Sequence, residues 1–313
     1  MRVRLILTLL LALIVSASCG REAESSAVTT VVDPGPAIDG ARALLEAGDV
    51  AAAAQAAWTL VQAHPDRLDA RLVLASANVL QGKHVEALAQ ADAALRLDPN
   101  SADAHTDRGA ALHGLGRPSE ALKATESALE LNADHQGALR NAARLHGEAK
   151  RWLAERAALE HLGRLRVADA EVRLLLARNR VNAADLKGAR HAIEEAVERA
   201  PDNPALHTFA ATVAYEMDRL EGAMDHANIA LRLDPERRDA LLVFEAAFYV
   251  RVASVLRCSE GAQPWSDGAV SKVLERYATQ GIGGVERFRA MHARQGGQAD
   301  VMARVRRVGA CDD

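Results

Sequence analysis

Aromatic side chains are scarce in this chain. Only 3% of its 313 residues are Phe, Trp or Tyr, although 49% are hydrophobic, and much of the apolar content is alanine. Small side chains of this kind suit closely packed helices and suit the core of a β-sheet poorly. The composition therefore favours an all-α protein.

An excess of positive charge is also missing. The chain has 38 Lys and Arg residues against 42 Asp and Glu residues, which gives a formal net charge of −4. A nucleic-acid-binding protein normally carries a concentrated basic face. We therefore expect no nucleic-acid partner.

Recognisable catalytic motifs are absent from the sequence. The eleven histidines include no His-x-x-x-His pair with a catalytic glutamate and no Cys/His cluster of zinc spacing. No Gly-x-Ser-x-Gly elbow occurs, and residues 281–284 (GIGG) lack the strand-turn-helix context of a phosphate loop. We expect a protein that is not an enzyme and that needs no metal or cofactor. The alternative is an accessory subunit of an enzyme, with an unrecognised site in the C-terminal tail.

Only three cysteines are present, and the first follows an export-like segment. Arg2 and Arg4 precede an apolar run over residues 5–15, which is too short to span a bilayer. Residues 1–19 therefore predict a signal peptide, and the small residues before Cys19 resemble a bacterial lipobox. We expect lipidation of Cys19. The alternative is ordinary cleavage nearby, which leaves an exported protein with a free thiol.

Residues 20–36 lack helical periodicity and include two prolines. They predict a flexible tether with a reach of roughly 20–25 Å, enough to hold a domain just off a membrane. The expected location is the bacterial envelope, on a lipid anchor facing the periplasm.

The other two cysteines bracket the C-terminal tail. In an oxidising compartment Cys258 and Cys311 are expected to form a disulfide, worth about 4 kcal/mol by the chain-entropy model. The alternative is two unpaired thiols.

A period of 34 residues runs through most of the chain. Pro65, Pro99, Pro201 and Pro235 share one frame, with Ala133 and Val167 at the two intervening slots. A fixed period of this size indicates a stack of two-helix units. The six predicted repeats are residues 34–67, 68–101, 102–135, 136–169, 170–203 and 204–237.

Other residues in the same frame have clear roles. Proline cannot continue a helix, so it separates one unit from the next. Gly48, Gly82 and Gly116 suit the turn between the two helices, where a positive φ is often needed. Alanines let the second helices approach their neighbours closely; they are Ala53, Ala87, Ala121, Ala189 and Ala223.

The repeats resemble the tetratricopeptide repeat family over residues 34–237. The matching segments include Glu86-Ala87-Leu88 and Glu120-Ala121-Leu122, and the letters ALRLDP occur at both 94–99 and 230–235. The resemblance implies a right-handed superhelical solenoid of about six helix pairs, whose first helices line a concave groove. The family's early aromatic position is replaced in five repeats, by Arg71, His105, Leu139, Arg173 and His207. Repeat 4 departs furthest, with Lys150, Glu155 and Leu162 where Gly, Ala and Ala are usual.

The end of the repeat region needs a cap, because a solenoid end otherwise exposes an apolar face. Residues 238–257 predict a seventh first helix, so the solenoid with its cap spans 37–257, and a short helical tail spans 258–313. Apolar residues recur at helical spacing within 285–291 and within 301–308. Arg304, Arg306 and Arg307 predict contact with anionic lipid or an acidic partner, or else solvated arginines on a disulfide-tied cap.

The groove offers one candidate binding site. Arg140 and Arg144 share a helix face, and Arg178 lies one full repeat after Arg144. Three guanidinium groups on adjacent helices suit a carboxylate or an acidic peptide. The alternative is solvated arginines paired with Glu148 or Glu171. Ser76 and Ala110 stand where the chaperone-binding clamp of the family has asparagine, so that partner is not expected.

The layout looks like that of the lipoprotein pilotins of type IV pili. It favours a membrane-tethered scaffold that binds a protein partner or an extended peptide in its groove and helps assemble an envelope complex. The alternative of a soluble periplasmic ligand-binding protein has Phe209 and Tyr215 as its main groove aromatics. The sequence predicts no oligomeric state.

Overall fold

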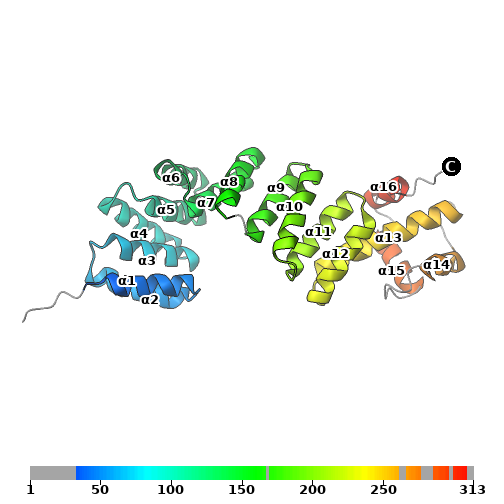
Figure 1. The fold of residues 1–313 in the computed structure, drawn as a ribbon, viewed down its shortest axis with the longest axis horizontal. Helices are drawn as coiled ribbons and strands as arrows, with labels where there is room; N and C mark the ends of the chain where they lie inside the picture. Colours follow the sequence, from blue (N-terminus) through cyan, green and yellow to red (C-terminus); the bar gives the residue numbers. More distant parts are fainter. Residues whose placement is uncertain (1–32, 167–168, 261–265, 276–284, 296–298, 309–313) are drawn as a thin grey trace, which may run out of the picture.

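The described part of the chain is a row of helix pairs. The computed structural model describes residues 33–166, 169–260, 266–275, 285–295 and 299–308, and these hold sixteen α-helices and no strand. The expected all-α solenoid is therefore confirmed, and Figure 1 shows the pairs stacked from α1 at one end to α14–α16 at the other. The signal peptide and most of the tether lie outside the described residues. Within 33–166 and the other described ranges, no helix is long and apolar enough to cross a membrane.

Six helix pairs correspond to the six predicted repeats. Each first helix has 12 or 13 residues and each second helix has 14. α1 begins at Gly35, inside the predicted tether. The pairs are α1 Gly35–Glu46 with α2 Val50–Ala63, α3 Leu68–Leu80 with α4 His84–Leu97, α5 Ala102–Gly114 with α6 Pro118–Leu131, α7 Gln136–Glu148 with α8 Trp152–Leu165, α9 Ala170–Asn182 with α10 Leu186–Arg199, and α11 Pro204–Glu216 with α12 Leu220–Leu233.

The turn within each pair uses a left-handed residue. Gly48, Gly82 and Gly116 have φ angles of 84, 72 and 72°, as expected from the sequence. The next three turns keep the same conformation without glycine, at Lys150 (55°), Ala184 (60°) and Asp218 (59°). The 34-residue frame therefore continues through repeat 4.

Replacing Ala184 by glycine is expected to stabilise the protein. An L-residue in the left-handed region costs about 1–2 kcal/mol, and glycine escapes this cost but loses more chain entropy, so we expect a net gain of about 1 kcal/mol. Urea unfolding of Ala184→Gly measures it. The matched control is Ala183→Gly, because Ala183 has a φ of −87°. That change should lower stability by about 0.5–1 kcal/mol, and equal effects of the two substitutions would contradict the argument.

Alanine at the start of the second helices allows tight packing. Five of these alanines, in repeats 1, 2, 3, 5 and 6, are fully buried at 0% exposure. In repeat 4 the slot holds Glu155, which is still only 6% exposed. Its Oε2 accepts a 2.9 Å hydrogen bond from Nδ2 of Asn179 on α9. Gly147 on α7 makes room, because a Cβ there would lie 3.0 Å from the Glu155 carboxyl.

Three of the four polar residues at the early aromatic position have a shared role. Nε of Arg71 donates to the carbonyl of Pro65 at 2.8 Å. Nε2 of His105 and of His207 make the same contact with the carbonyls of Pro99 and Pro201, at 3.1 and 2.8 Å. These side chains satisfy a carbonyl in the turn that joins one repeat to the next.

The stacking of the first helices changes along the solenoid. α1, α3 and α5 each contact the next first helix, up to α7, and α11 contacts the following helix α13 in the same way. Among the described helices, no comparable contact joins α7 to α9 or α9 to α11. The concave side is therefore wider around α9.

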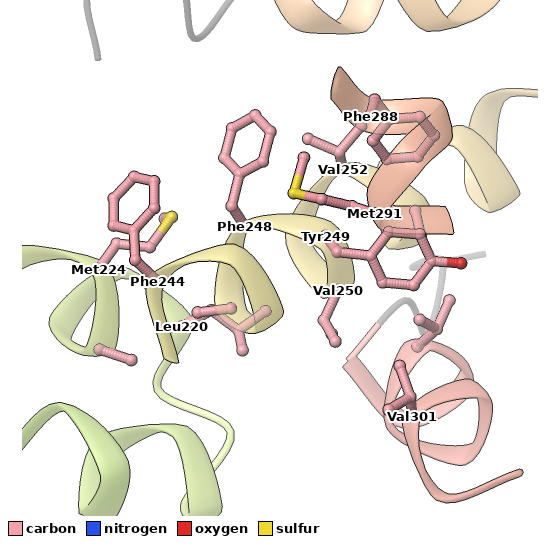
Figure 2. Close-up of a cluster of buried hydrophobic side chains, with 14 of the residues drawn as sticks. Leu220, Met224, Phe244, Phe248, Tyr249, Val250, Val252, Phe288, Met291 and Val301 are labelled. Atoms are coloured by element: carbon pink, nitrogen blue, oxygen red, sulfur yellow. The ribbon is translucent and has the colours of Figure 1, made fainter. Parts of the chain in front are cut away.

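The C-terminal segment folds back onto the last repeat. α13 (Arg238–Glu260) contains the predicted seventh first helix and extends past it, and α14 (Asp267–Leu274), α15 (Val285–Gln295) and α16 (Ala299–Val308) all contact it. Figure 2 shows the shared core, in which Phe288 and Met291 of α15 meet Tyr249 of α13. The tail is thus a substantial cap. Cys258 is disulfide-bonded, and its expected partner Cys311 lies outside the described residues.

Candidate functional site: the concave groove

Two hollows lie where the first helices separate. The larger, of about 660 Å³, is lined by residues of α3, α5, α7, α8 and α9. The smaller, of about 290 Å³, lies between α9 and α11 and is also lined by Arg237 and Asp239. Arg178 lines both hollows, so they meet at its side chain. Together they form one groove along the concave side.

The structure brings the three sequence-predicted arginines together. Arg140 and Arg144 on α7 and Arg178 on α9 all line the larger hollow, and all three are exposed. Their shared location agrees with the one-repeat spacing. Their role in binding a partner stays a prediction.

These arginines make only long or uncharged contacts, so their positive charge remains available to a ligand. A terminal nitrogen of Arg140 lies 3.6 Å from Asp169 and 3.9 Å from Glu171, which are long ion pairs. Nη2 of Arg144 donates to Oδ1 of Asn141 at 3.2 Å. Arg178 makes no ion pair within the described ranges. Loose pairs of this kind contribute little and exchange readily for a ligand carboxylate.

Apolar residues line the same hollow as the arginines. Leu80 of α3 is 64% exposed, and it lines the hollow together with Val79, Trp152 and Leu175. An exposed leucine inside a hollow suits an apolar ligand side chain, because its contact removes apolar surface from water. The site therefore combines an apolar surface with three cations.

Most acidic residues of the hollow already have a hydrogen-bond or ion-pair partner. Glu155 accepts from Asn179, and Glu148 faces Nε2 of His113 at 2.8 Å rather than an arginine. Of the two expected acidic partners in the described ranges, only Glu171 forms an ion pair with one of the three arginines. The expected pairing with Glu148 is therefore not the arrangement in the structure.

The two aromatics expected in the groove differ in access. Phe209 lines the smaller hollow. Tyr215 is covered, because the guanidinium carbon of Arg304 lies 4.2 Å from its ring centre. Arg304 is only 12% exposed and forms ion pairs with Glu216 and Asp218, so it holds α16 in place and is not a solvated arginine. The side chains of Arg306 and Arg307 lie outside the described residues.

Asp107 of α5 lies three residues before Ala110, which lines the larger hollow. Ser76, at one of the clamp positions, donates its hydroxyl to Asp107 at 2.9 Å. Burial raises the pKa of the half-buried Asp107 carboxyl to about 7, and neighbouring Asp103 raises it further, while Ser76 and His135 oppose the shift. Near neutrality this carboxyl gains charge.

Replacing Asp107 by asparagine is expected to stabilise the protein above neutral pH. The folded pKa exceeds the reference value of 3.8, so the folded state holds an extra proton between the two values. Stability from this group is complete below about pH 4 and falls as the pH rises towards 7. A shift from 3.8 to about 7 corresponds to at most about 4 kcal/mol, and solvent screening of the half-buried carboxyl reduces this. At pH 8, Asp107→Asn should therefore gain about 1–2 kcal/mol over wild type, and at pH 4 nothing. Urea unfolding across this range measures the difference, and exposed Asp66→Asn is the control; a pH-independent effect would contradict the prediction.

Sequence reasoning missed the apolar half of the site. Leu80 comes from a helix two repeats before α7, and its spacing gives no sign that it lines the same hollow as Arg144. Trp152, by contrast, begins α8 within the same repeat as Arg140. The sequence therefore offers a signal for Trp152, because an aromatic residue close to an arginine pair often forms part of a binding surface.

Comparison with known families identifies the repeats. A tetratricopeptide repeat model matches residues 38–102 and 174–238. The unmatched stretch between them contains Lys150, Glu155 and Leu162, the residues that depart from the pattern. A search of curated protein sequences finds no match.

Solved structures show the same architecture. PilW, a type IV pilus biogenesis factor, is 18% identical, with a TM-score of 0.60, over 67% of this chain and 97% of its own. PilF of Pseudomonas aeruginosa is 19% identical (TM-score 0.53; 72% and 97% covered), and YrrB, a TPR protein with an unusual peptide-binding site, is also 19% identical (0.51; 60% and 97%). At these identities the likeness shows the fold. The chain is therefore a helical solenoid of the tetratricopeptide type, with tetratricopeptide repeats in residues 38–102 and 174–238.

Proposed function

We propose that the protein is a non-catalytic interaction scaffold whose concave groove holds an extended acidic segment of a partner protein. The observation that carries this proposal is the meeting of Arg140, Arg144 and Arg178 in one hollow that is also lined by an exposed leucine, Leu80. Proteins of this repeat type generally bind other chains and lack catalytic activity, which agrees with the absence of catalytic motifs from the sequence.

The preferred ligand follows from the groove's dimensions and charges. Extended chain advances about 3.3 Å per residue, so a short segment passes from the larger hollow across Arg178 to the smaller one. Acidic side chains would face the three arginines, and an apolar side chain would contact Leu80 and Trp152. Phe209 offers a second apolar contact in the smaller hollow.

The proposed location is the bacterial envelope. The signal-like residues 1–19 and the lipobox-like placement of Cys19 support it. In this proposal the lipid anchor and tether place the solenoid at a membrane, where it helps assemble a complex. The fold shared with PilW is compatible with a pilotin-like role, although similar solenoids serve many processes.

A crosslinked pull-down from membranes tests the proposal. Wild type should recover envelope proteins, and Arg140→Glu/Arg144→Glu/Arg178→Glu should lose them. Cys19→Ala should leave the membrane fraction. Partners retained by the triple variant would remove the arginine site, and Cys19→Ala fractionating like wild type would remove the lipid anchor.

A further inference from the structure

A second recess lies outside the concave groove, between repeats 1 and 2. Its volume is about 710 Å³, and it is lined by residues of α2, α3, α4 and the turn before α4. None of its lining residues belongs to either hollow of the concave groove. We infer that this recess binds a neutral oligosaccharide, with the ring of Trp58 as its platform. The inference is independent of the proposed peptide site.

Trp58 is unusual for its place in the repeat. At the same slot, 34 residues apart, the later repeats carry Asp92, Glu126, Glu160, Glu194 and Asn228. These are polar residues suited to a solvated helix surface. Trp58 instead leaves a large aromatic ring 52% exposed within the recess. A tryptophan presents a flat apolar face together with a polar N–H, which matches a sugar ring with its apolar C–H face and hydroxyl edge.

Asn78 of α3 gives a second, independent sign of a ligand. Its side chain lines the recess and the residue is only 7% exposed. Among the described residues no protein group bonds to its side-chain amide, and the amide atoms are not sealed from solvent, so they are open to the recess. In repeat 3 the same slot holds Leu112, so the fold itself does not need an amide there. An amide that is open to the recess and has no protein partner is available to bond to a polar ligand.

Two glutamines offer complementary groups in fixed orientations. Nε2 of Gln81 donates to the carbonyl of Val50 at 3.2 Å, which leaves its amide oxygen as an acceptor. Oε1 of Gln90 accepts from Arg71 at 3.0 Å, which leaves its amide NH₂ as a donor. Sugar hydroxyls both donate and accept, so they can satisfy both glutamines and Asn78 at once.

The charge of the recess favours a neutral ligand. Among the described residues, Lys83 and Glu86 are the only charged ones that line it, and their charges cancel. A polyproline peptide also stacks on tryptophan, but such peptides dock in grooves lined by several aromatics. Here one aromatic is accompanied by four amide side chains, Gln55, Asn78, Gln81 and Gln90. The balance of amides over aromatics therefore favours a sugar.

Calorimetric titration of the full-length protein with chitotetraose, cellotetraose and maltotetraose tests the inference. At least one should bind wild type with a Kd of about 0.1–1 mM. Trp58→Glu and Asn78→Leu should each weaken that binding about tenfold or more. Both replacements copy residues found at the same slots of other repeats, so both should fold, which circular dichroism checks. Leu153→Glu, at an exposed leucine of α8 outside the recess, and the groove triple variant should bind like wild type.

Three results would overturn the inference. One is no binding of any of the three sugars up to about 10 mM. Another is sugar binding that survives both Trp58→Glu and Asn78→Leu. The third is binding of decaproline in place of every sugar, which would make the recess a peptide site.

Discussion

Phe288→Ala is expected to lower the free energy of unfolding of the C-terminal cap by about 3–5 kcal/mol, the usual cost of truncating a fully buried phenylalanine. Phe288 has 0% exposure, and its ring stacks on Tyr249 with 5.5 Å between ring centres and 24° between the planes. Met291 and Val301 belong to the same core. Removing the ring leaves a cavity between α13 and α15, and neighbouring side chains fill that cavity only in part.

The effect should be local. In a solenoid each repeat contacts only its neighbours, so damage at one end is transmitted weakly to the other. Hydrogen exchange should show lost protection in α13 and α15 while α3–α6 keep theirs, and urea unfolding should separate into two transitions. Leu242→Ala is the control, because Leu242 lies on the same helix α13 but is 62% exposed. A cost below about 1 kcal/mol for Phe288→Ala would show that α15 is not part of the stable core.

The cap illustrates what periodicity in a sequence reveals. Helical spacing within 285–291 and 301–308 predicts α15 and α16 correctly, because amphipathic helices carry their own local pattern. The contact between Tyr249 and Phe288 joins residues 39 positions apart without any repeat to set the register. The sequence therefore predicts only a short tail, whereas the structure has a core that the tail shares with repeat 6.

The sequence likewise predicts one part of the candidate site and not another. The 34-residue frame predicts that Arg144 and Arg178 lie side by side, since equivalent residues of adjacent repeats stack. The frame does not predict that α7 and α9 separate. That separation accompanies Glu155, whose buried carboxyl with Asn179 occupies a position where other repeats pack a methyl group. A departure from a repeat pattern thus marks the place where the groove opens.

Reversing the three groove arginines is expected to weaken partner binding by roughly 100-fold. Each change from Arg to Glu replaces an attraction to the acidic ligand by a repulsion. Near a solvated surface this makes the binding free energy less favourable by about 1 kcal/mol per change, so three changes give about 3 kcal/mol. The fold should survive, because Arg140, Arg144 and Arg178 are exposed and the two ion pairs of Arg140 are long, at 3.6 and 3.9 Å. Titration of a partner recovered by pull-down against wild type and Arg140→Glu/Arg144→Glu/Arg178→Glu measures the loss.

A matched triple variant separates the site from net charge. Arg96, Arg164 and Arg232 are exposed, share one slot on the second helices of three repeats, and line neither hollow of the groove. Arg96→Glu/Arg164→Glu/Arg232→Glu changes the total charge by the same amount, so it should retain most of the affinity. Raising the salt concentration should weaken wild type towards the groove variant, because exposed charge pairs are screened. Equal losses in both triple variants would mean that overall charge, and not the groove between α7 and α9, attracts the partner.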